Sequence, residues 1–197
     1  SGTTEDLVGV WGPDANNVFA AGSVGTILRF DGTNWNSQTS GTTAGLLGIS
    51  GTATNNVYAV GDAGTILHFI GTSWCAEGSS ATTQVLAGVS GQSSTNIFAV
   101  GLAGTSLAGT ILHSDGTSWT AQTSGTSNDL LGVFAPTTIS VFAVGMAGTV
   151  LHYDGTSWSG QTSSTSNDLN GVWGPGGNEV FAVGFGGTIL HTTNGGT

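Results

Sequence analysis

Short apolar runs, separated by polar and glycine-rich turns, follow one another along the whole chain. A glycine preceded by two mostly apolar residues recurs every 39 to 44 residues, at Gly9, Gly48, Gly88, Gly132 and Gly171. A second glycine follows each of these by 13 residues, at Gly22, Gly61, Gly101, Gly145 and Gly184. A fixed period of this length is typical of stacked structural repeats, and it argues against two unrelated domains.

Each repeat is predicted to contain four short strands. In the first repeat these are residues 7–11, 18–21, 26–30 and 35–39. The turn before the fourth strand is Asp-Gly in three repeats, and this pair favours tight hairpins. Runs such as residues 141–145 are apolar at successive positions, which indicates sheets packed between two others.

These patterns predict an all-β fold, a five-repeat β-propeller with four-stranded antiparallel blades of about 39 residues. Another all-β repeat is the alternative. We expect residues 1–197 to form a single domain, with repeats at 1–39, 40–79, 80–123, 124–162 and 163–197. Glycine accounts for 35 residues, which agrees with frequent tight turns.

Two repeats depart from the pattern. The third has an insertion in its second turn, within residues 101–110, which is either a tolerated loop or a loop that contacts a ligand. The fifth has Thr197 where the other repeats have tryptophan, so its outer strand is expected to be missing. Closure of the five repeats into a ring is favoured. The alternatives are a fragment of a longer chain, or a strand supplied by a partner at the open edge.

The residues Gly9-Val10-Trp11-Gly12, Val18-Phe19-Ala20 and 148–155, with Trp158, resemble repeats of uncharacterised bacterial extracellular propellers. Residues 192–197, Thr-Thr-Asn-Gly-Gly-Thr, are similar to the Asp-box turn of sialidase-like propellers and of photosystem II assembly-factor repeats. The resemblance covers the whole chain and implies the fold, because such repeats accompany several unrelated functions. It also implies an extracellular or cell-surface location, with any signal sequence already removed.

Charge is sparse and almost entirely negative. Charged residues make up 6% of the sequence, the net charge is −10, and Arg29 is the only lysine or arginine. Nucleic acids and anionic membranes bind clustered cations, so neither is an expected partner. Sialidases bind the substrate carboxylate with three arginines, and the assembly-factor propellers use a basic patch. Neither feature can be placed on this sequence.

No catalytic residue, metal site or cofactor is predicted, and we expect that the chain is not an enzyme. Asp31, Asp115 and Asp154 occupy equivalent turns of different repeats, which would keep their carboxylates too far apart for a glycosidase pair. Four histidines share one repeat position with Arg29 and would diverge around a ring; each is expected to bond its own turn. The single cysteine, Cys75, is either a small filler on an outer strand or a reactive thiol.

Aromatic residues are the best candidates for binding. Trp35, Trp74, Trp119 and Trp158 begin the fourth strands and are predicted to pack between blades. Trp11, Phe134 and Trp173 replace serine at the end of the innermost strand, and ring closure would gather them near the channel mouth. They either pack structurally or form a surface for sugar stacking, with Asp14, Asn17 and Asn178 as hydrogen-bond partners.

The predicted function is a non-catalytic extracellular binding or structural module that mediates protein or surface interactions. A carbohydrate-binding lectin is the alternative, and a glycoside-acting enzyme is the less favoured one. The predicted partner is a protein or a glycan, and self-association or strand addition at the last blade is a further expectation.

Overall fold

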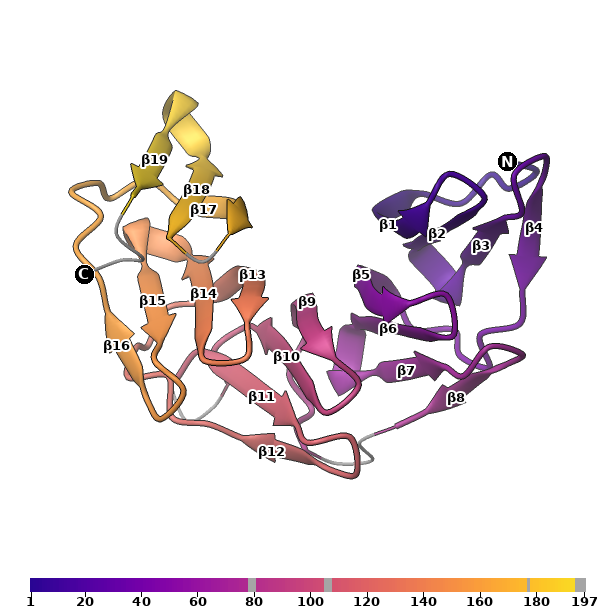
Figure 1. Cartoon of the computed structure of the whole chain (residues 1–197), viewed down its shortest axis with the longest axis horizontal. Helices are drawn as coiled ribbons and strands as arrows, with labels where there is room; N and C mark the ends of the chain where they lie inside the picture. Colours follow the sequence, from indigo (N-terminus) through magenta and orange to yellow (C-terminus); the bar gives the residue numbers. More distant parts are fainter. Residues whose placement is uncertain (78–80, 105–107, 177, 194–197) are drawn as a thin grey trace. The chain divides into compact units, whose positions relative to one another are not determined.

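The computed structural model describes residues 1–77, 81–104, 108–176 and 178–193. In these residues the chain forms five antiparallel sheets, and in each sheet the strands lie side by side in sequence order (Figure 1). Four sheets have four strands and the fifth has three. The predicted all-β fold with four-stranded repeats is confirmed, and so is the three-stranded last sheet within the described residues.

The strands of the first sheet are β1 (Leu7–Asp14), β2 (Asn17–Gly22), β3 (Ile27–Phe30) and β4 (Trp35–Gln38). Those of the second are β5 (Leu46–Ala53), β6 (Asn56–Gly61), β7 (Ile66–Phe69) and β8 (Trp74–Ala76). Those of the third are β9 (Leu86–Ser93), β10 (Asn96–Gly101), β11 (Thr110–Ser114) and β12 (Trp119–Ala121).

The strands of the fourth sheet are β13 (Leu130–Thr137), β14 (Ser140–Gly145), β15 (Val150–Tyr153) and β16 (Trp158–Gly160). Those of the fifth are β17 (Leu169–Gly176), β18 (Glu179–Gly184) and β19 (Ile189–Thr192). Single 3-10 turns connect second and third strands at η1 (Ser23–Gly25), η2 (Asp62–Gly64), η3 (Met146–Gly148) and η4 (Phe185–Gly187). No helix in the described residues is long and apolar enough to cross a membrane.

The internal contacts divide the chain into two compact units, Ser1–Val89 and Ser90–Thr197. The first unit contains the first and second sheets, and the second contains β10 to β12 with the fourth and fifth sheets; β9 lies at the boundary. The single domain and the closed ring stay predictions. The insertion at residues 101–110 and the turn at 194–195 fall partly or wholly outside the described residues.

A close backbone approach explains the second glycine of the repeat at Gly22, Gly61, Gly145 and Gly184. In the fourth sheet, Gly145 N–H donates to the Thr149 carbonyl at 3.0 Å, and Met146 N–H donates to the Asp129 carbonyl at 3.0 Å. A Cβ at Gly145 would collide with that same Asp129 carbonyl. Ala147, the centre of the turn, has a φ of 52°. The close approach of two backbone segments therefore requires glycine at this position.

The core of the first unit lies between its two sheets. Phe19, on β2, contacts both Phe69 and Trp74 of the second sheet, with ring centroids 5.3 Å and 6.0 Å away. Phe19 is fully buried and Trp74 is 8% exposed. The aromatic side chain of one sheet is thus covered by an aromatic pair from the end of the third strand and the start of the fourth strand of the next sheet.

The second unit repeats this arrangement. Phe98, on β10, contacts Tyr153 and Trp158 of the fourth sheet at centroid distances of 5.4 Å and 5.8 Å. The predicted packing of fourth-strand tryptophans between sheets is confirmed for Trp74 and Trp158. Trp35 is 37% exposed, and its ring packs on Phe30 of its own sheet.

Candidate functional site

Two of the three predicted aromatic binding residues are neighbours in the structure. Phe134, on β13, and Trp173, on β17, have ring centroids 6.4 Å apart and an interplanar angle of 36°. Trp173 is 63% exposed and Phe134 is half-buried. The pair forms an aromatic surface on the middle of the first strands of the fourth and fifth sheets, β13 and β17.

Trp11, the third predicted aromatic residue, lies in the other unit. It is half-buried and packs against the core between the first and second sheets. Its ring covers Gly51 so closely that a Cβ there would lie 2.8 Å from the indole. Trp11 therefore has a packing role in the first unit, and its membership of one arc with Phe134 and Trp173 stays a prediction.

The predicted polar partners also lie in different places. Asp14 accepts hydrogen bonds from the Asn16 N–H at 2.8 Å and from the Asn17 side-chain amide at 3.1 Å. Asn17 Oδ1 in turn accepts from Arg29 Nη2 at 2.9 Å. These residues bond one another at the first turn of the first sheet. Asn178 is exposed at the corresponding turn of the fifth sheet, close to β17 and β18.

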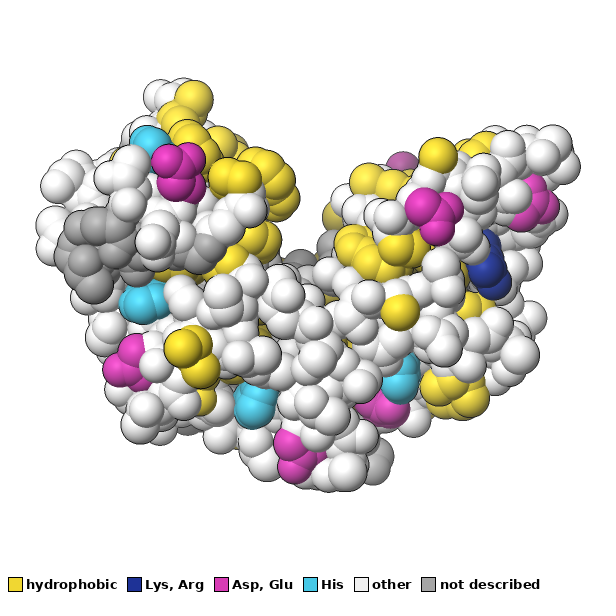
Figure 2. Space-filling view, in the orientation of Figure 1, with side chains coloured by type: hydrophobic (Ala, Val, Ile, Leu, Met, Phe, Trp, Pro, Cys, Tyr) yellow, Lys and Arg dark blue, Asp and Glu magenta, His cyan; other side chains and the backbone are white. Residues whose placement is uncertain are grey.

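One face of the fifth sheet carries exposed apolar side chains. Cross-strand pairing places Trp173 beside Phe181 and Val183 beside Ile189. Val183 is 48% exposed and Ile189 is 71% exposed. In the fourth sheet the equivalent Val144 is completely buried. Hydrophobic side chains accordingly gather over β17 to β19 at the upper left of Figure 2. We call Trp173, Phe181, Val183 and Ile189 the exposed face of the fifth sheet.

The opposite face of the fifth sheet borders a cavity of about 410 Å³. Its apolar lining comes from both the fourth and the fifth sheet, and the polar segment after β16 completes it. The lining residues are Phe142, Val144, Val150, Gln161, Thr162, Ser163, Val172, Val180, Ala182, Leu190, His191 and Thr192. The repeat pattern of the sequence did not predict this cavity. The signal that could have indicated it is Thr192, at the position where the fourth repeat has Tyr153.

Each of the four histidines stacks its ring on the aromatic residue opposite it on the second strand of its own sheet. The ring pairs are Tyr58 with His68, Phe98 with His113, Phe142 with His152, and Phe181 with His191, at centroid distances of 4.1 to 4.6 Å. In the first sheet, the Arg29 guanidinium lies 5.3 Å from the Phe19 ring centroid. Among the described residues, no group of three or more histidine, cysteine or acidic side chains could hold a metal ion.

The predicted hydrogen bond of each histidine to its own turn is wrong for three histidines. Nε2 of His113 bonds Asn96 at 3.0 Å, and Nε2 of His152 bonds Ser140 at 3.0 Å. Nε2 of His68 bonds Asn56 at 2.7 Å. Residues two apart on a strand share a face, so the first residue of the second strand lies diagonally opposite the histidine.

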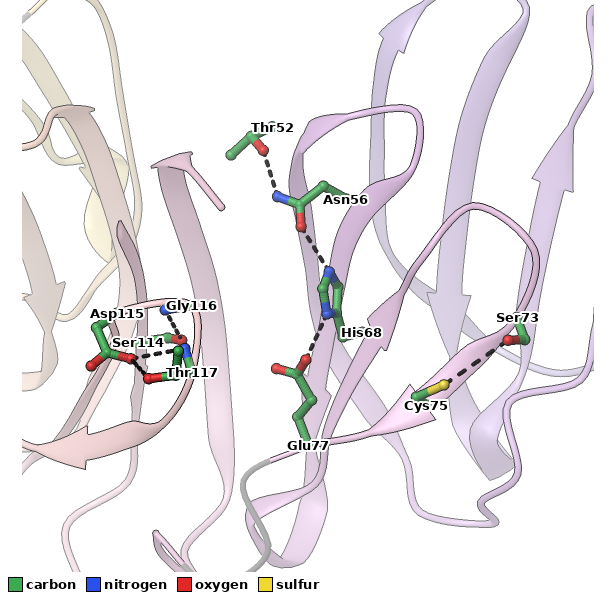
Figure 3. A network of polar contacts seen from close by, with 10 residues as sticks. All are labelled: Thr52, Asn56, His68, Ser73, Cys75, Glu77, Ser114, Asp115, Gly116 and Thr117. Atoms are coloured by element: carbon green, nitrogen blue, oxygen red, sulfur yellow. Dashed lines mark hydrogen bonds and ion pairs between the residues drawn. The ribbon is translucent and has the colours of Figure 1, made fainter. Parts of the chain in front are cut away.

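Among the four histidines at this repeat position, His68 has the most extensive hydrogen-bond network in the described residues (Figure 3). Its Nδ1 lies 2.6 Å from Glu77 Oε1, and Asn56, which faces Nε2, donates to Thr52 at 2.5 Å. Burial, with a smaller contribution from the Glu77 charge, raises the pKa of the Tyr58 hydroxyl beneath it to about 12. Burial also lowers the pKa of His113 and His152. The negative charges of Asp115 and Asp154 raise the pKa of these histidines, but by less than burial lowers it.

The hairpin aspartates act as turn residues. Asp115 Oδ1 accepts from the Thr117 hydroxyl at 2.7 Å and from the N–H groups of Thr117 and Ser118 at 2.8 and 2.9 Å. These bonds lower the Asp115 pKa to about 2, with the Thr117 side chain as the largest cause. Gly116, next in the turn, has a φ of 87°. The carboxylate oxygen that accepts these bonds is engaged within its own turn, as expected for an Asx-turn.

Cys75 lies on β8, an outer strand, and its thiol is exposed. Its Sγ is 3.9 Å from the Ser73 hydroxyl (Figure 3). The position on an outer strand agrees with the expectation, whereas a filling role does not, because the side chain faces solvent.

Comparison with known proteins gives structural likeness only. The sequence matches no known family, and no curated protein matches it. YCF48 from Cyanidioschyzon merolae has a TM-score of 0.72 at 16% identity, over 96% of this chain and 67% of that one. YCF48 bound to a D1 peptide has a TM-score of 0.53 at 15% identity, over 100% of this chain and 80% of that one.

A propeller of another class is equally similar. The WD40 β-propeller domain of Doa1 has a TM-score of 0.73 at 10% identity, over 97% of this chain and 66% of that one. The chain thus spans about two thirds of the length of these propellers, and more of the peptide-bound YCF48. At these identities the likeness concerns the fold alone. The five antiparallel sheets are the blades of a β-propeller.

Proposed function

We propose that this chain is a non-catalytic protein-interaction module that binds a partner through the exposed face of the fifth sheet. One observation carries the proposal. Val183 is 48% exposed, whereas its equivalents in the four other sheets, Ala21, Val60, Val100 and Val144, are completely buried. An apolar surface of this kind on a folded protein marks an interaction site.

The chemistry of the partner follows from charge. The net charge of −10 and the single arginine favour a neutral or basic protein surface with apolar side chains at its centre. A propeller similar to this chain, YCF48, has been solved with a bound D1 peptide, which supports peptide or protein binding as a use of this fold. The engaged turn aspartates and the separated histidines support a role without catalysis.

Site-specific photocrosslinking tests the proposal. Ile189 is replaced by benzoylphenylalanine in the full chain, which is then irradiated in extracts of the source cells. Ile139, a turn isoleucine that is 66% exposed, is the matched control position. We expect a discrete adduct from position 189, absent from position 139 and abolished by Val183→Asp. Equal adducts from both positions, or an adduct that survives Val183→Asp, would contradict the proposed surface.

A carbohydrate-binding role is the second candidate, and the Phe134–Trp173 pair favours it. An exposed indole beside a second ring offers an apolar surface to a sugar, and Asn178 of the same sheet is exposed for a hydrogen bond. A glycan array with multivalently presented chain tests this role. If the chain is a lectin, free sugar should compete with its binding to the array. Trp173→Ala should abolish this binding, whereas Trp35→Ala should leave it unchanged. An array without signal from folded protein contradicts it.

We also propose that the protein works outside the cell or at its surface. Support comes from Arg29, the only site for trypsin-like cleavage, and from hydrogen-bonded strands that resist other proteases. Surface biotinylation is uninformative here because the chain has no lysine, so immunogold labelling of intact source cells is the measurement. Labelling restricted to the cytoplasm would refute this location.

A further inference from the structure

The first strands of the first, second, fourth and fifth sheets each carry one extra residue near their start. In the fifth sheet Leu169 pairs with Gly184, and the next pair is Gly171 with Val183. Asn170 and Gly171 of β17 therefore oppose a single residue of β18. This arrangement is a β-bulge, in which one residue is left out of the ladder of hydrogen bonds. Corresponding register shifts follow Leu7, Leu46 and Leu130.

The repeat position of Asn170 carries a side-chain amide only in the fifth repeat. The other repeats have Val8, Leu47, Ala87 and Leu131 there, each followed by glycine, as Asn170 is followed by Gly171. The side chain of Asn170 is exposed to solvent. Gly171 has no side chain that could hinder an approach to its backbone nitrogen. The bulge of the fifth sheet thus combines a carboxamide with an unhindered nucleophile.

We propose that Asn170 is a site of spontaneous covalent modification, at which the side-chain amide is lost and aspartate or isoaspartate forms. The backbone nitrogen of Gly171 attacks Cγ of Asn170, and the new C–N bond closes a five-membered succinimide. The bond from Cγ to Nδ2 breaks, and ammonia leaves with the proton of the Gly171 N–H. Water then opens the ring. Cleavage of the new C–N bond gives aspartate, and cleavage of the original peptide bond gives isoaspartate.

The bulge makes this reaction possible within a folded strand. Ring closure requires the peptide group after Asn170 to rotate out of the extended conformation. In a regular antiparallel strand this rotation breaks hydrogen bonds to the neighbouring strand. At a bulge the ladder is already disrupted, so the rotation breaks fewer of them. Exposure of Asn170 gives water access to the succinimide for the hydrolysis step.

Other exposed asparagines lack this combination. Asn34, Asn55 and Asn178 are exposed at turns or next to them, but the residue that follows each of them has a side chain beside the attacking nitrogen. Asn-Gly occurs at one further place in the sequence, residues 194–195, which lies outside the described residues. Among the described asparagines we therefore expect Asn170 to react first.

Either product changes β17. Both add one negative charge to a chain whose net charge is −10. Isoaspartate also lengthens the backbone by one carbon between Leu169 and Gly171, and so disturbs the pairing of both residues with β18. We expect the isoaspartate form to melt at a lower temperature than the natural chain. The reaction depends on this local structure and not on the function proposed above.

Mass spectrometry of the folded full chain tests the proposal. The chain is incubated in mildly alkaline buffer, and samples are digested with pepsin in acid, which halts the reaction. We expect the peptide that contains Asn170 to gain about 1 Da with time and to become a substrate for protein isoaspartate methyltransferase. Asn170→Gln should remove both signals. If a free peptide of residues 166–176 converts completely while Asn170 in the chain stays unchanged, the proposal is overturned.

Two variants separate the effect of the bulge from that of the Asn-Gly pair itself. Val8→Asn creates this pair at the bulge of the first sheet, where Val8 is 58% exposed. Ser159→Asn creates it at an exposed position of β16, which pairs with β15 in regular register. Circular dichroism verifies that both variants are folded.

Val8→Asn should gain a second modified site that reacts about as fast as Asn170. Ser159→Asn should react at least about tenfold more slowly, because a ladder hydrogen bond must break before the ring can close. Equal rates at the two introduced sites would contradict the bulge as the cause of the reactivity.

Discussion

The indole of Trp158 donates to the side-chain oxygen of Gln122 at 2.6 Å, and so connects the start of β16 with the chain just after β12. The same tryptophan packs edge-on against Phe98 at a centroid distance of 5.8 Å. One side chain thus joins the outer strands of two sheets while it covers the aromatic centre between them. Such sheet-to-sheet contacts are what hold a repeat protein together.

Gln122→Leu should therefore destabilise the chain by about 1–2 kcal/mol, because the half-buried indole N–H loses its acceptor. Urea unfolding monitored by tryptophan fluorescence measures the change. Gln38→Leu is the control: the Gln38 amide donates to the carbonyl of its neighbour Ser37, and no hydrogen bond from Gln38 to a tryptophan is seen among the described residues. Similar losses from the two variants would show that the contact with Trp158 contributes nothing of its own.

Phe98 and Phe181 occupy the same repeat position, but their replacement by alanine should cost very different amounts of unfolding free energy. Phe98 is 1% exposed and lies between two sheets, so Phe98→Ala should cost about 3–5 kcal/mol of unfolding free energy through the cavity it leaves. Phe181 is half-buried on the exposed face of the fifth sheet and mainly stacks on His191, so Phe181→Ala should cost about 1 kcal/mol. Urea denaturation midpoints of the two variants measure this difference. Comparable losses of stability would mean that the exposed face of the fifth sheet is covered in the isolated chain.

Gly145→Ala should destabilise the chain by about 1–3 kcal/mol or more, because the new Cβ meets the Asp129 carbonyl and the two backbone segments must separate. At Gly160, on β16, a Cβ would meet no atom within 4 Å. Gly160→Ala should leave the melting temperature unchanged or raise it slightly. A tolerated Gly145→Ala would contradict the close approach as the reason for glycine at this position.

Acid should weaken the fold in two steps. Burial lowers the folded-state pKa of His113 and His152 below 6.5, the usual value for histidine, so the unfolded chain binds protons first as the pH falls. Their contribution to stability is complete above pH 6.5 and is lost as the pH falls through that value toward the lower folded pKa. The turn aspartates, whose pKa is lowered by turn hydrogen bonds, add a further loss below about pH 4.

Melting temperatures measured between about pH 7.5 and pH 5 check the first step. The double variant His113→Gln and His152→Gln should lose less stability over this range than the natural chain. His191 is exposed, and His191→Gln is the matched control. An unchanged pH slope in the double variant would remove the histidines as its cause.

Local sequence determined the repeats, the strands and the hairpins. An antiparallel hairpin joins residues that are close in the chain, so apolar runs and turn pairs such as Asp115-Gly116 are enough to specify it. The predicted strands differ from the observed ones mainly at their ends. The first strand extends to Asp14 instead of Trp11, because β1 continues its pairing up to the turn, where Asp14 pairs with Asn17.

The sequence did not show that residues at equivalent repeat positions have different surroundings in the structure. Val144 and Val183 occupy the same place in the repeat, yet one is buried and the other is exposed, because burial depends on whether another sheet packs against that face. The contact of Phe134 with Trp173, the partners of the histidines and the cavity beside Phe142 likewise depend on side chains from separate strands or sheets. The sequence by itself determined the fold of each blade through local pairing; only the tertiary structure decided which copy of each position is covered and which is left to bind.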